Sequence, residues 1–370
     1  YMVNGDLMGF ISLRMASLSL KYGNNIYSSF GYAMTGLVET GILKHIKSGR
    51  KYYDLSVTLE EQYPNKLIKG RNMMLMSSFA APWTESISQY KKMMEQARSL
   101  NAELGVLQWA DFCVVFTRAQ SLFFGRDNLS DIHKENMKWL EFHIKNGDQQ
   151  VIANQKYIMH FIEHFQASSD SENQLTSDED KQAFDEKQHI SNISQEKNVT
   201  FQAYYHVLNQ LDNYLQGNYE SCVTEGMDLF MTVLNTFGIC LDAIHRYFYS
   251  LAYLAMDKTK LSLKQRIKAN LYFRLNSFYL SQYKKNHPDN YAAIYALLKA
   301  EVCRSKNQEN TALDYYEESI QLSQESSLFN EALAHERLAD FHHCAKRQSS
   351  ALLYAAQARK LYKRWGNNLQ

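Results

Sequence analysis

The fold of this chain is decided by residues 291–365, which read YAAIYALLKAEVCRSKNQENTALDYYEESIQLSQESSLFNEALAHERLADFHHCAKRQSSALLYAAQARKLYKRW. Packing residues in the first half return 39 positions later in the second, pairing Ala300 with Ala339, Ala312 with Ala351 and Tyr316 with Ala355. Small side chains at a fixed spacing let paired helices approach closely, and each hairpin then has an apolar face that only a neighbour can cover. The stretch therefore predicts two consecutive helical hairpins of a repeat array.

The composition of the whole chain is that of an all-α protein. Its 370 residues, too many for one ordinary core, include only 3 prolines and 15 glycines. Proline is excluded from helix interiors because it lacks an N–H group and clashes with the preceding turn. We expect Pro64, Pro82 and Pro288 to lie between helices. Some glycines fall where an apolar periodicity stops, and we expect them to end helices: Gly23, Gly70, Gly125, Gly147 and Gly217.

Helical periodicity extends upstream of the terminal stretch. Gly31, Ala33 and Gly36 fall on neighbouring turns of one segment, and because glycine lowers helix propensity, we interpret Gly36 as a close helix–helix packing position. The sequence predicts an α-α superhelix of antiparallel hairpins, arranged as one array or as two lobes. The expected upstream helices are 8–22, 28–43, 46–63, 67–79, 85–104, 106–124, 129–145, 149–165, 201–215, 219–234, 239–256 and 264–283.

A polar segment interrupts this pattern. Residues 167–198 are rich in Ser, Asp, Glu, Gln and Asn and have little to bury, which predicts a solvated linker or a long loop. Phe184 and Ile190 are its strongest candidates for contact with the folded body. We therefore expect an N-terminal helical lobe at 1–166 and a C-terminal helical lobe at 199–370.

Charge and cysteine content favour a cytosolic protein without a nucleic-acid partner. The formal net charge is +1, so no global field draws the chain to nucleic acid or to an anionic membrane. No apolar run approaches the roughly 20 residues of a spanning helix. The start at Tyr1 suggests a fragment of a longer polypeptide. The five cysteines are scattered beside apolar residues, which predicts reduced core thiols: Cys113, Cys222, Cys240, Cys303 and Cys344.

Two histidine clusters are candidate metal sites. His160 and His164 lie four apart with Glu163 between them, in the H-x-x-E-H order of some zinc hydrolases. Such a site needs a third ligand, and an interface or surface histidine pair is the expected structure. The second cluster is His342-His343-Cys344 with His335 two turns earlier, where an ordinary helix end facing solvent is expected. No phosphate-binding loop or serine elbow occurs, so we expect no catalytic residue, no metal and no cofactor.

Basic residues cluster at three places along the sequence. A solvated face or a contact with an acidic protein partner is the expected role, because acidic residues offset the clusters overall. The last cluster, which crowds the final helix, provides the candidate partner contacts Arg359, Lys360, Lys363 and Arg364. The other two are Lys44, Lys47, Arg50 and Lys51, and Lys264, Arg266 and Lys268.

Short motifs along the chain resemble a known helical region. They are ASLSLKYGN at 16–24, YAMTGL at 32–37, FDE at 184–186, FYSLAYLA at 248–255, NEALA at 330–334 and YKRWG at 362–366. In this order they resemble the tetratricopeptide-like region of large bacterial multidomain signalling proteins. There it follows a serine/threonine-kinase-like domain and a STAND-type, AAA-related ATPase, and it commonly precedes GAF or PAS sensors and a histidine kinase. The resemblance implies a tetratricopeptide-like solenoid without catalytic residues of its own.

Three functions remain open from the sequence. The first is an interaction or sensor module that binds a protein partner on the solenoid surface and relays this state to attached ATPase or kinase domains. The second is a rigid spacer that positions flanking domains and binds nothing itself. The third is a zinc hydrolase that uses His160, Glu163 and His164.

Overall fold

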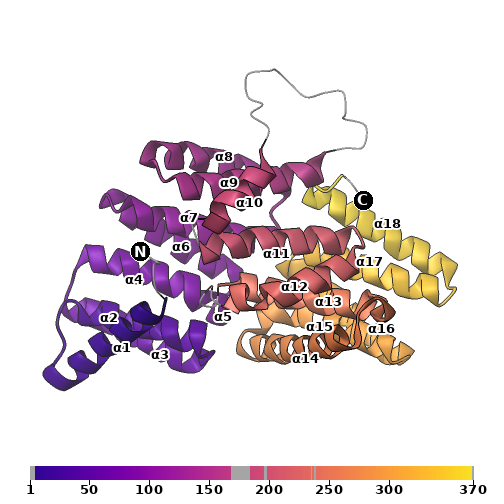
Figure 1. Ribbon diagram of the computed structural model, residues 1–370, viewed down its shortest axis with the longest axis horizontal. Coiled ribbons are helices and arrows are strands. Elements are labelled where there is room, and N and C mark those ends of the chain that lie inside the picture. The colour runs from indigo at the N-terminus through magenta and orange to yellow at the C-terminus, as the bar shows by residue number, and fades with distance from the viewer. Residues whose placement is uncertain (1–4, 168–183, 196–197, 235, 237–238, 369–370) are drawn as a thin grey trace, which may run out of the picture. The chain divides into compact units, whose positions relative to one another are not determined.

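The computed structural model describes residues 5–167, 184–195, 198–234, 236 and 239–368 (Figure 1). Over these residues every regular element is a helix, and the only β-type pairing is an isolated parallel bridge between Gly125 and Ser327. The predicted all-α class is therefore confirmed. None of the described helices is both long and apolar enough to cross a membrane.

The helices follow one another along the chain, with short connections except at residues 167–185 between α9 and α10. The first half contains α1 (Gly5–Tyr22), α2 (Ser28–Leu37), the π-helix η1 (Val38–Ile42), α3 (Ile46–Gln62), α4 (Lys66–Phe79), α5 (Ala81–Thr84), α6 (Ile87–Glu103), α7 (Leu107–Phe123), α8 (Leu129–Asn146) and α9 (Gln149–Gln166). The second half contains α10 (Glu186–Gln195), α11 (Val199–Leu215), α12 (Tyr219–Leu234), α13 (Leu241–Ala255), the 3₁₀ turn η3 (Lys258–Lys260), α14 (Leu263–Asn286), α15 (Pro288–Ser305), α16 (Glu309–Ser326), α17 (Leu328–Cys344) and α18 (Gln348–Trp365).

Each predicted helix has a counterpart with ends shifted by a few residues, but the predicted helix 28–43 is α2 continued by the π-helix η1. The predictions for two prolines and one glycine differ from the structure for local reasons. Pro82 lies inside the short α5 and Pro288 begins α15, whereas both were expected between helices. A first helical turn accepts proline because its N–H groups lack intrahelical partners. Gly70 was expected to end a helix, but it lies within α4, where an added Cβ would come 2.8 Å from Asn101 Oδ1. That glycine serves close packing rather than termination.

The chain divides into two compact units. Unit 1 comprises Tyr1–Ala119, Lys197–Ala203 and Phe230–Asp242, and unit 2 comprises the rest. This division crosses α7 and does not follow the expected lobes at 1–166 and 199–370. Much of the expected linker, 168–183 and 196–197, lies outside the described residues.

The described part of the linker, 184–195, is not a loop. Its α10 packs on α9, where the His189 ring stacks on Tyr157 with centroids 5.1 Å apart. The Phe184 ring lies 5.8 Å from that of Tyr157, so this aromatic residue does contact the folded body of unit 2. The Tyr205 hydroxyl of α11 donates a hydrogen bond to Glu186 Oε1 at 2.9 Å.

In unit 1, α2 and α3 approach each other through two glycines. A Cβ added at Gly36 would lie 2.9 Å from Tyr53 Cε2 and 3.1 Å from the Gly49 carbonyl oxygen. A Cβ added at Gly49 would lie 2.3 Å from Thr40 Cγ2. The distances of 2.9 Å at Gly36 and 2.3 Å at Gly49 are shorter than real Cβ contacts, so a side chain at either position would push the helices apart.

In unit 2, the terminal helices pack in chain order. Helix α15 packs on α16, α16 on α17, and α17 on α18. Ala300 and Ala312 are completely buried, as are Ala339 and Ala351 to within a few per cent. The third repeat-related pair differs, because Tyr316 is buried whereas Ala355 is exposed. Helix α17 covers the face of α16, and no described helix covers the equivalent face of α18.

The same turn joins the helices of several hairpins. In each, a residue with positive φ donates its N–H to the carbonyl three residues back, and the next residue donates to the carbonyl five back, as in a Schellman motif. The following helix begins two residues after the positive φ each time. The positive-φ residues are Gly105, Gly217, Asn307 and Lys346, with φ of 70°, 77°, 57° and 58°.

Unit 2 also contains contacts between segments far apart in sequence. The Gly125 N–H donates to the Ser326 carbonyl at 2.8 Å, and the Leu328 N–H donates to the Gly125 carbonyl at 3.0 Å. The Ser327 hydroxyl donates to the Phe123 carbonyl at 2.7 Å. We call this set the loop contact. It joins the connection after α7 to the connection between α16 and α17.

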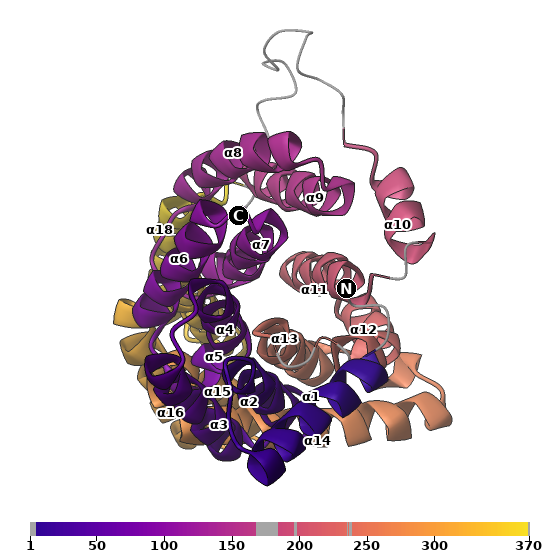
Figure 2. The same cartoon turned by 90° about the vertical axis from the view of Figure 1, so that its left-hand side faces the viewer.

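The end of α18 makes a second distant contact in unit 2. The Trp365 ring lies between those of Phe329 and Phe165, with centroids 4.8 and 6.1 Å away. The Asn368 N–H donates to the Phe165 carbonyl at 2.9 Å, at the end of α9. Helices α8 and α9 lie side by side (Figure 2). Unit 2 is thus held by distant contacts in addition to those between sequence neighbours.

Candidate functional site

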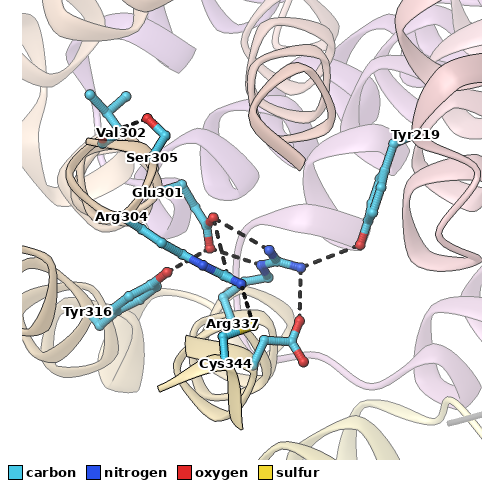
Figure 3. A network of polar contacts seen from close by, with 9 residues as sticks. Tyr219, Glu301, Val302, Arg304, Ser305, Tyr316, Arg337 and Cys344 are labelled. Atoms are coloured by element: carbon cyan, nitrogen blue, oxygen red, sulfur yellow. Dashed lines mark hydrogen bonds and ion pairs between the residues drawn. The ribbon is translucent and has the colours of Figure 1, made fainter. Parts of the chain in front are cut away.

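A buried ionic network lies within the terminal hairpins of unit 2 (Figure 3). Arg337 of α17 donates from Nε to Glu301 Oε1 of α15 at 2.9 Å and from Nη2 to Oε2 at 3.4 Å. Both side chains are buried, with 6% and 5% of their surface exposed. Two charges removed from water are tolerated only when they are paired and hydrogen-bonded, so this contact fixes the register of α17 against α15.

Further groups complete the coordination of this pair. The Tyr316 hydroxyl of α16 donates to Glu301 Oε1 at 2.8 Å. Arg337 Nη1 donates to Asp340 Oδ2 at 3.0 Å and to the Tyr219 hydroxyl of α12 at 3.4 Å. Arg304 Nη1 lies 3.7 Å from Glu301 Oε2. The network therefore connects α12, α15, α16 and α17.

The charges shift the protonation equilibria of the network. Burial alone would raise the pKa of Glu301, but Arg337, Arg304 and the Tyr316 hydrogen bond outweigh burial, and the pKa is held below its ordinary value. Burial and the Glu301 charge both raise the pKa of Tyr316. The carboxylate is therefore ionised and the phenol neutral at neutral pH, which matches the observed direction of donation.

Two tyrosine hydroxyls near the network lack partners. Tyr214 Oη and Tyr247 Oη are buried, and neither has a hydrogen-bond partner among the described residues. Burial raises the pKa of both phenols, and the Arg337 charge acts against this rise. A buried hydroxyl without a partner costs free energy, so the surroundings of these two groups are polar but incompletely satisfied.

The first histidine cluster does not converge on one point. His160 stacks on Phe184 with centroids 5.1 Å apart, Glu163 Oε1 lies 2.8 Å from His133 Nε2, and His164 Nε2 lies 3.4 Å from Asp212 Oδ1. Each of these three side chains therefore has a different partner in unit 2. No group of three potential metal ligands occurs anywhere in the described residues.

The second histidine cluster forms ring stacks within the last hairpin. His335 and His342 share a face, as their spacing predicted, and both contact Tyr354 of α18, with centroids 5.9 and 5.4 Å away. Burial lowers the pKa of both imidazoles, which keeps them neutral. Cys344 Sγ accepts a hydrogen bond from Arg304 Nη2 at 3.3 Å. This cysteine is exposed, unlike the other four, which are buried as predicted.

The basic residues predicted to meet an acidic partner lie along one side of α18. Arg359, Lys360, Lys363 and Arg364 are all exposed. None of the four has an ion-pair partner within the described part of the chain. Leu352 and Leu353 of the same helix are also exposed, at 61% and 58%. The face left uncovered at the end of the hairpin stack is thus both apolar and cationic.

Sequence reasoning missed the ionic network. Its signal lay in the repeat: Glu301 and Asp340 are 39 residues apart and both bind Arg337. An arginine surrounded by Leu333, Leu338 and alanines on a predicted core face was the second signal. Comparison with known proteins adds no further assignment, because no protein-family model and no curated protein matches the chain.

Proposed function

We propose that this chain is a non-catalytic protein-interaction or sensor module, a tetratricopeptide-like solenoid in a multidomain bacterial signalling protein of the cytoplasm. It binds a protein partner on its surface and relays this state to attached ATPase or kinase domains. The observation that carries the proposal is the recurrence of one hairpin turn, at Asn307 and again 39 residues later at Lys346. Repeats that reuse one turn and one packing register build extended surfaces suited to binding proteins.

The binding face we favour is the uncovered side of α18. Its four unpaired cations match an acidic partner, and Leu352 and Leu353 would be buried on binding. Charges that face a partner accelerate association and select against partners of like charge, while buried apolar side chains supply affinity.

The relay would use the packing between hairpins. A partner shifts an equilibrium between two arrangements only by the difference in its affinity for them. The Glu301–Arg337 pair offers a discrete contact that either forms or breaks when α17 moves against α15. Helix packings with such contacts switch between states rather than deform continuously.

The test is isothermal titration calorimetry of the chain against each separately produced domain encoded beside it. We expect one of them to bind, and the combined change of Arg359, Lys360, Lys363 and Arg364 to Glu to weaken binding at least roughly tenfold. As a control for charge reversal elsewhere on unit 2, Lys134, Lys138 and Lys145, three exposed lysines of α8, are changed to Glu. Equal affinity for the α18 variant and the unchanged chain would refute this binding face.

A rigid spacer is the second candidate, and the loop contact favours it. Two backbone hydrogen bonds and the Ser327 side chain hold segments about 200 positions apart in sequence. Such cross-links restrict changes of curvature. Deletion of the α17–α18 hairpin with flanking domains in place separates the two functions, since regulation of those domains survives in a spacer and is lost in a sensor.

A further inference from the structure

Residues 258–288 carry charge of one sign. Eight lysines and arginines occur there and no aspartate or glutamate, although the whole chain has a net charge of only +1. The segment includes η3 and the whole of α14, the longest described helix with 24 residues. The basic residues are Lys258, Lys260, Lys264, Arg266, Lys268, Arg274, Lys284 and Lys285.

Four large apolar side chains lie exposed on the same helix. Leu263 is 74% exposed, Ile267 64%, Leu271 61% and Phe278 56%. At 100° per residue these positions fall within one quarter of the helix circumference. They form one continuous row, which we call the apolar crest.

The opposite side of α14 is fixed to unit 2. Ala269, Asn276, Leu280 and Tyr283 are buried. The Ala269 carbonyl accepts a hydrogen bond from the Tyr249 hydroxyl at 3.2 Å, and the buried Arg246 donates to Asn276 Oδ1 at 2.8 Å. The crest therefore cannot turn inward without breaking this packing.

The basic residues border the crest on both sides. By the helical angle, Lys264 and Lys268 lie on one flank and Arg266 on the other, while Arg274 falls within the crest itself. Lys268 has a 3.9 Å ion pair with Asp228, which is 87% exposed. Lys264, Arg274 and Lys285 have no ion-pair partner among the described residues. Lys260 and Lys284 have ion pairs with Glu220 and Glu318 at 3.5 and 3.9 Å. Five of the eight basic residues therefore have no ion-pair partner in the described part of the chain.

We propose that α14 docks on an anionic phospholipid surface through the apolar crest and its basic flanks. In this arrangement α14 lies in the plane of the interface, with the exposed apolar row among the acyl chains and the lysines and arginines at the phosphates. Arg274 reaches the phosphates from within the row by extending its aliphatic stem. This surface is distinct from α18, so the inference is independent of the proposed function.

The charge pattern favours lipid over an acidic protein helix. An amphipathic helix that binds a protein lays its apolar row into a hydrophobic groove of the partner. Beside the crest α14 carries only basic charges, so such a partner would need acidic groups along both walls of its groove. A fluid bilayer needs no preformed groove, and its anionic headgroups match a helix that carries no aspartate or glutamate.

The test is co-sedimentation of the full chain with vesicles. Vesicles of phosphatidylcholine alone are compared with vesicles that contain phosphatidylcholine and phosphatidylserine at about seven to three. We expect binding only to the mixed vesicles, and each basic residue removed lowers the partition coefficient by roughly fivefold. The charge variant is Lys264→Gln with Lys285→Gln, and the crest variant is Ile267→Ser with Leu271→Ser.

Matched controls come from α8, whose exposed face carries charges of both signs. Lys134→Gln with Lys145→Gln removes the same charge, and Met137→Ser with Ile144→Ser removes exposed apolar side chains of 44% and 56% exposure. Circular dichroism and thermal unfolding verify that all variants fold. Equal loss in the α8 and α14 variants would overturn the proposal. So would absence of vesicle binding combined with α14-dependent binding of poly-glutamate, which would indicate an acidic protein partner.

Discussion

The hairpin α15–α16 and the hairpin α17–α18 repeat each other in backbone and differ in what they bury. Their turns have the same dihedral angles and hydrogen bonds at Asn307 and Lys346. At the position of Glu301, buried and doubly bound, the second hairpin has Asp340, whose side chain is 51% exposed. At the position of Tyr316 it has the exposed Ala355.

This difference follows from the place of each hairpin in the packing order. The first hairpin has neighbours on both sides, α14 and α17, whereas α18 has no described helix on its outer side. Glu301 is paired with Arg337 of the following hairpin, whereas no described helix follows α18 to supply an equivalent partner for Asp340. The repeated sequence therefore sets the backbone geometry of both hairpins, and the position of each hairpin in the stack decides which of its polar side chains are buried.

Removal of the buried carboxylate should have the largest effect. Glu301→Gln leaves the buried Arg337 with only the half-exposed Asp340 as counter-ion, and we expect the free energy of unfolding to fall by roughly 3–5 kcal/mol. The repeat-related change Asp340→Asn affects a half-exposed pair and should cost about 0–1 kcal/mol. Denaturant unfolding of both variants measures the difference. Equal losses would mean that the two positions are equivalent after all.

Enlargement of the alanines should give an intermediate effect. Ala312→Leu adds a large side chain at a completely buried position between α15 and α16 and should cost roughly 1–3 kcal/mol. Ala351→Leu lies at the related position of the last hairpin, where the free side of α18 lets the helix shift. We expect a smaller loss there, measured by the same unfolding experiment. A larger loss at Ala351 would contradict the view that the second hairpin is the open end.

Acidification should destabilise the second hairpin more than the first, and we expect this difference to be smaller than the effects above. The second hairpin has His335 and His342 where the first has Ala296 and Cys303. Since burial lowers the pKa of both histidines, the unfolded chain binds protons first as the pH falls below about 6.5, and stability is lost from that pH downward. Amide hydrogen exchange at pH 7 and pH 5.5 should show faster opening of α17–α18. His335→Phe with His342→Phe should remove this dependence, and its persistence would point to other groups.

Substitution of the turn residues by glycine should change stability least, and by similar amounts in the two hairpins. Asn307→Gly and Lys346→Gly relieve a left-handed conformation at φ of 57° and 58°. We expect each to raise the free energy of unfolding by up to about 1 kcal/mol, with the larger gain at Lys346, because asparagine tolerates this conformation better than lysine. Thermal unfolding measures both. Destabilisation at either position would show that its turn is not shared.

Sequence patterns predicted the parts of the fold that depend on local chemistry. Helix periodicity gave nearly every helix, and Gly147 and Gly217 end helices because only glycine adopts positive φ without cost. Gly70 could not be assigned correctly, since its role depends on Asn101, 31 residues away. The sequence predicts a linker at α10 because the segment is mostly polar. Its contacts with the folded body are made by two polar residues, His189 with Tyr157 and Glu186 with Tyr205.

The sites depend on contacts that no local pattern contains. The loop contact joins Gly125 to Ser327, and the ionic network joins Tyr219 to Arg337, over separations of more than one hundred residues. The histidines of the H-x-x-E-H motif share a helix, but their partners His133 and Asp212 come from other helices and divide the motif. The basic cluster Lys264, Arg266 and Lys268 was visible in the sequence, but the exposed apolar row beside it depends on which face of α14 packs on unit 2.

The most direct test of the central claim is amide hydrogen exchange over residues 288–365 in the unchanged chain and in Glu301→Gln. We expect slow exchange in α15 and α17, faster exchange in α18, and a loss of protection in Glu301→Gln that extends across both hairpins, because Arg337 links them. Uniform protection of all four helices, or a loss confined to α15, would contradict an interior hairpin joined by a buried ion pair to an open-ended one.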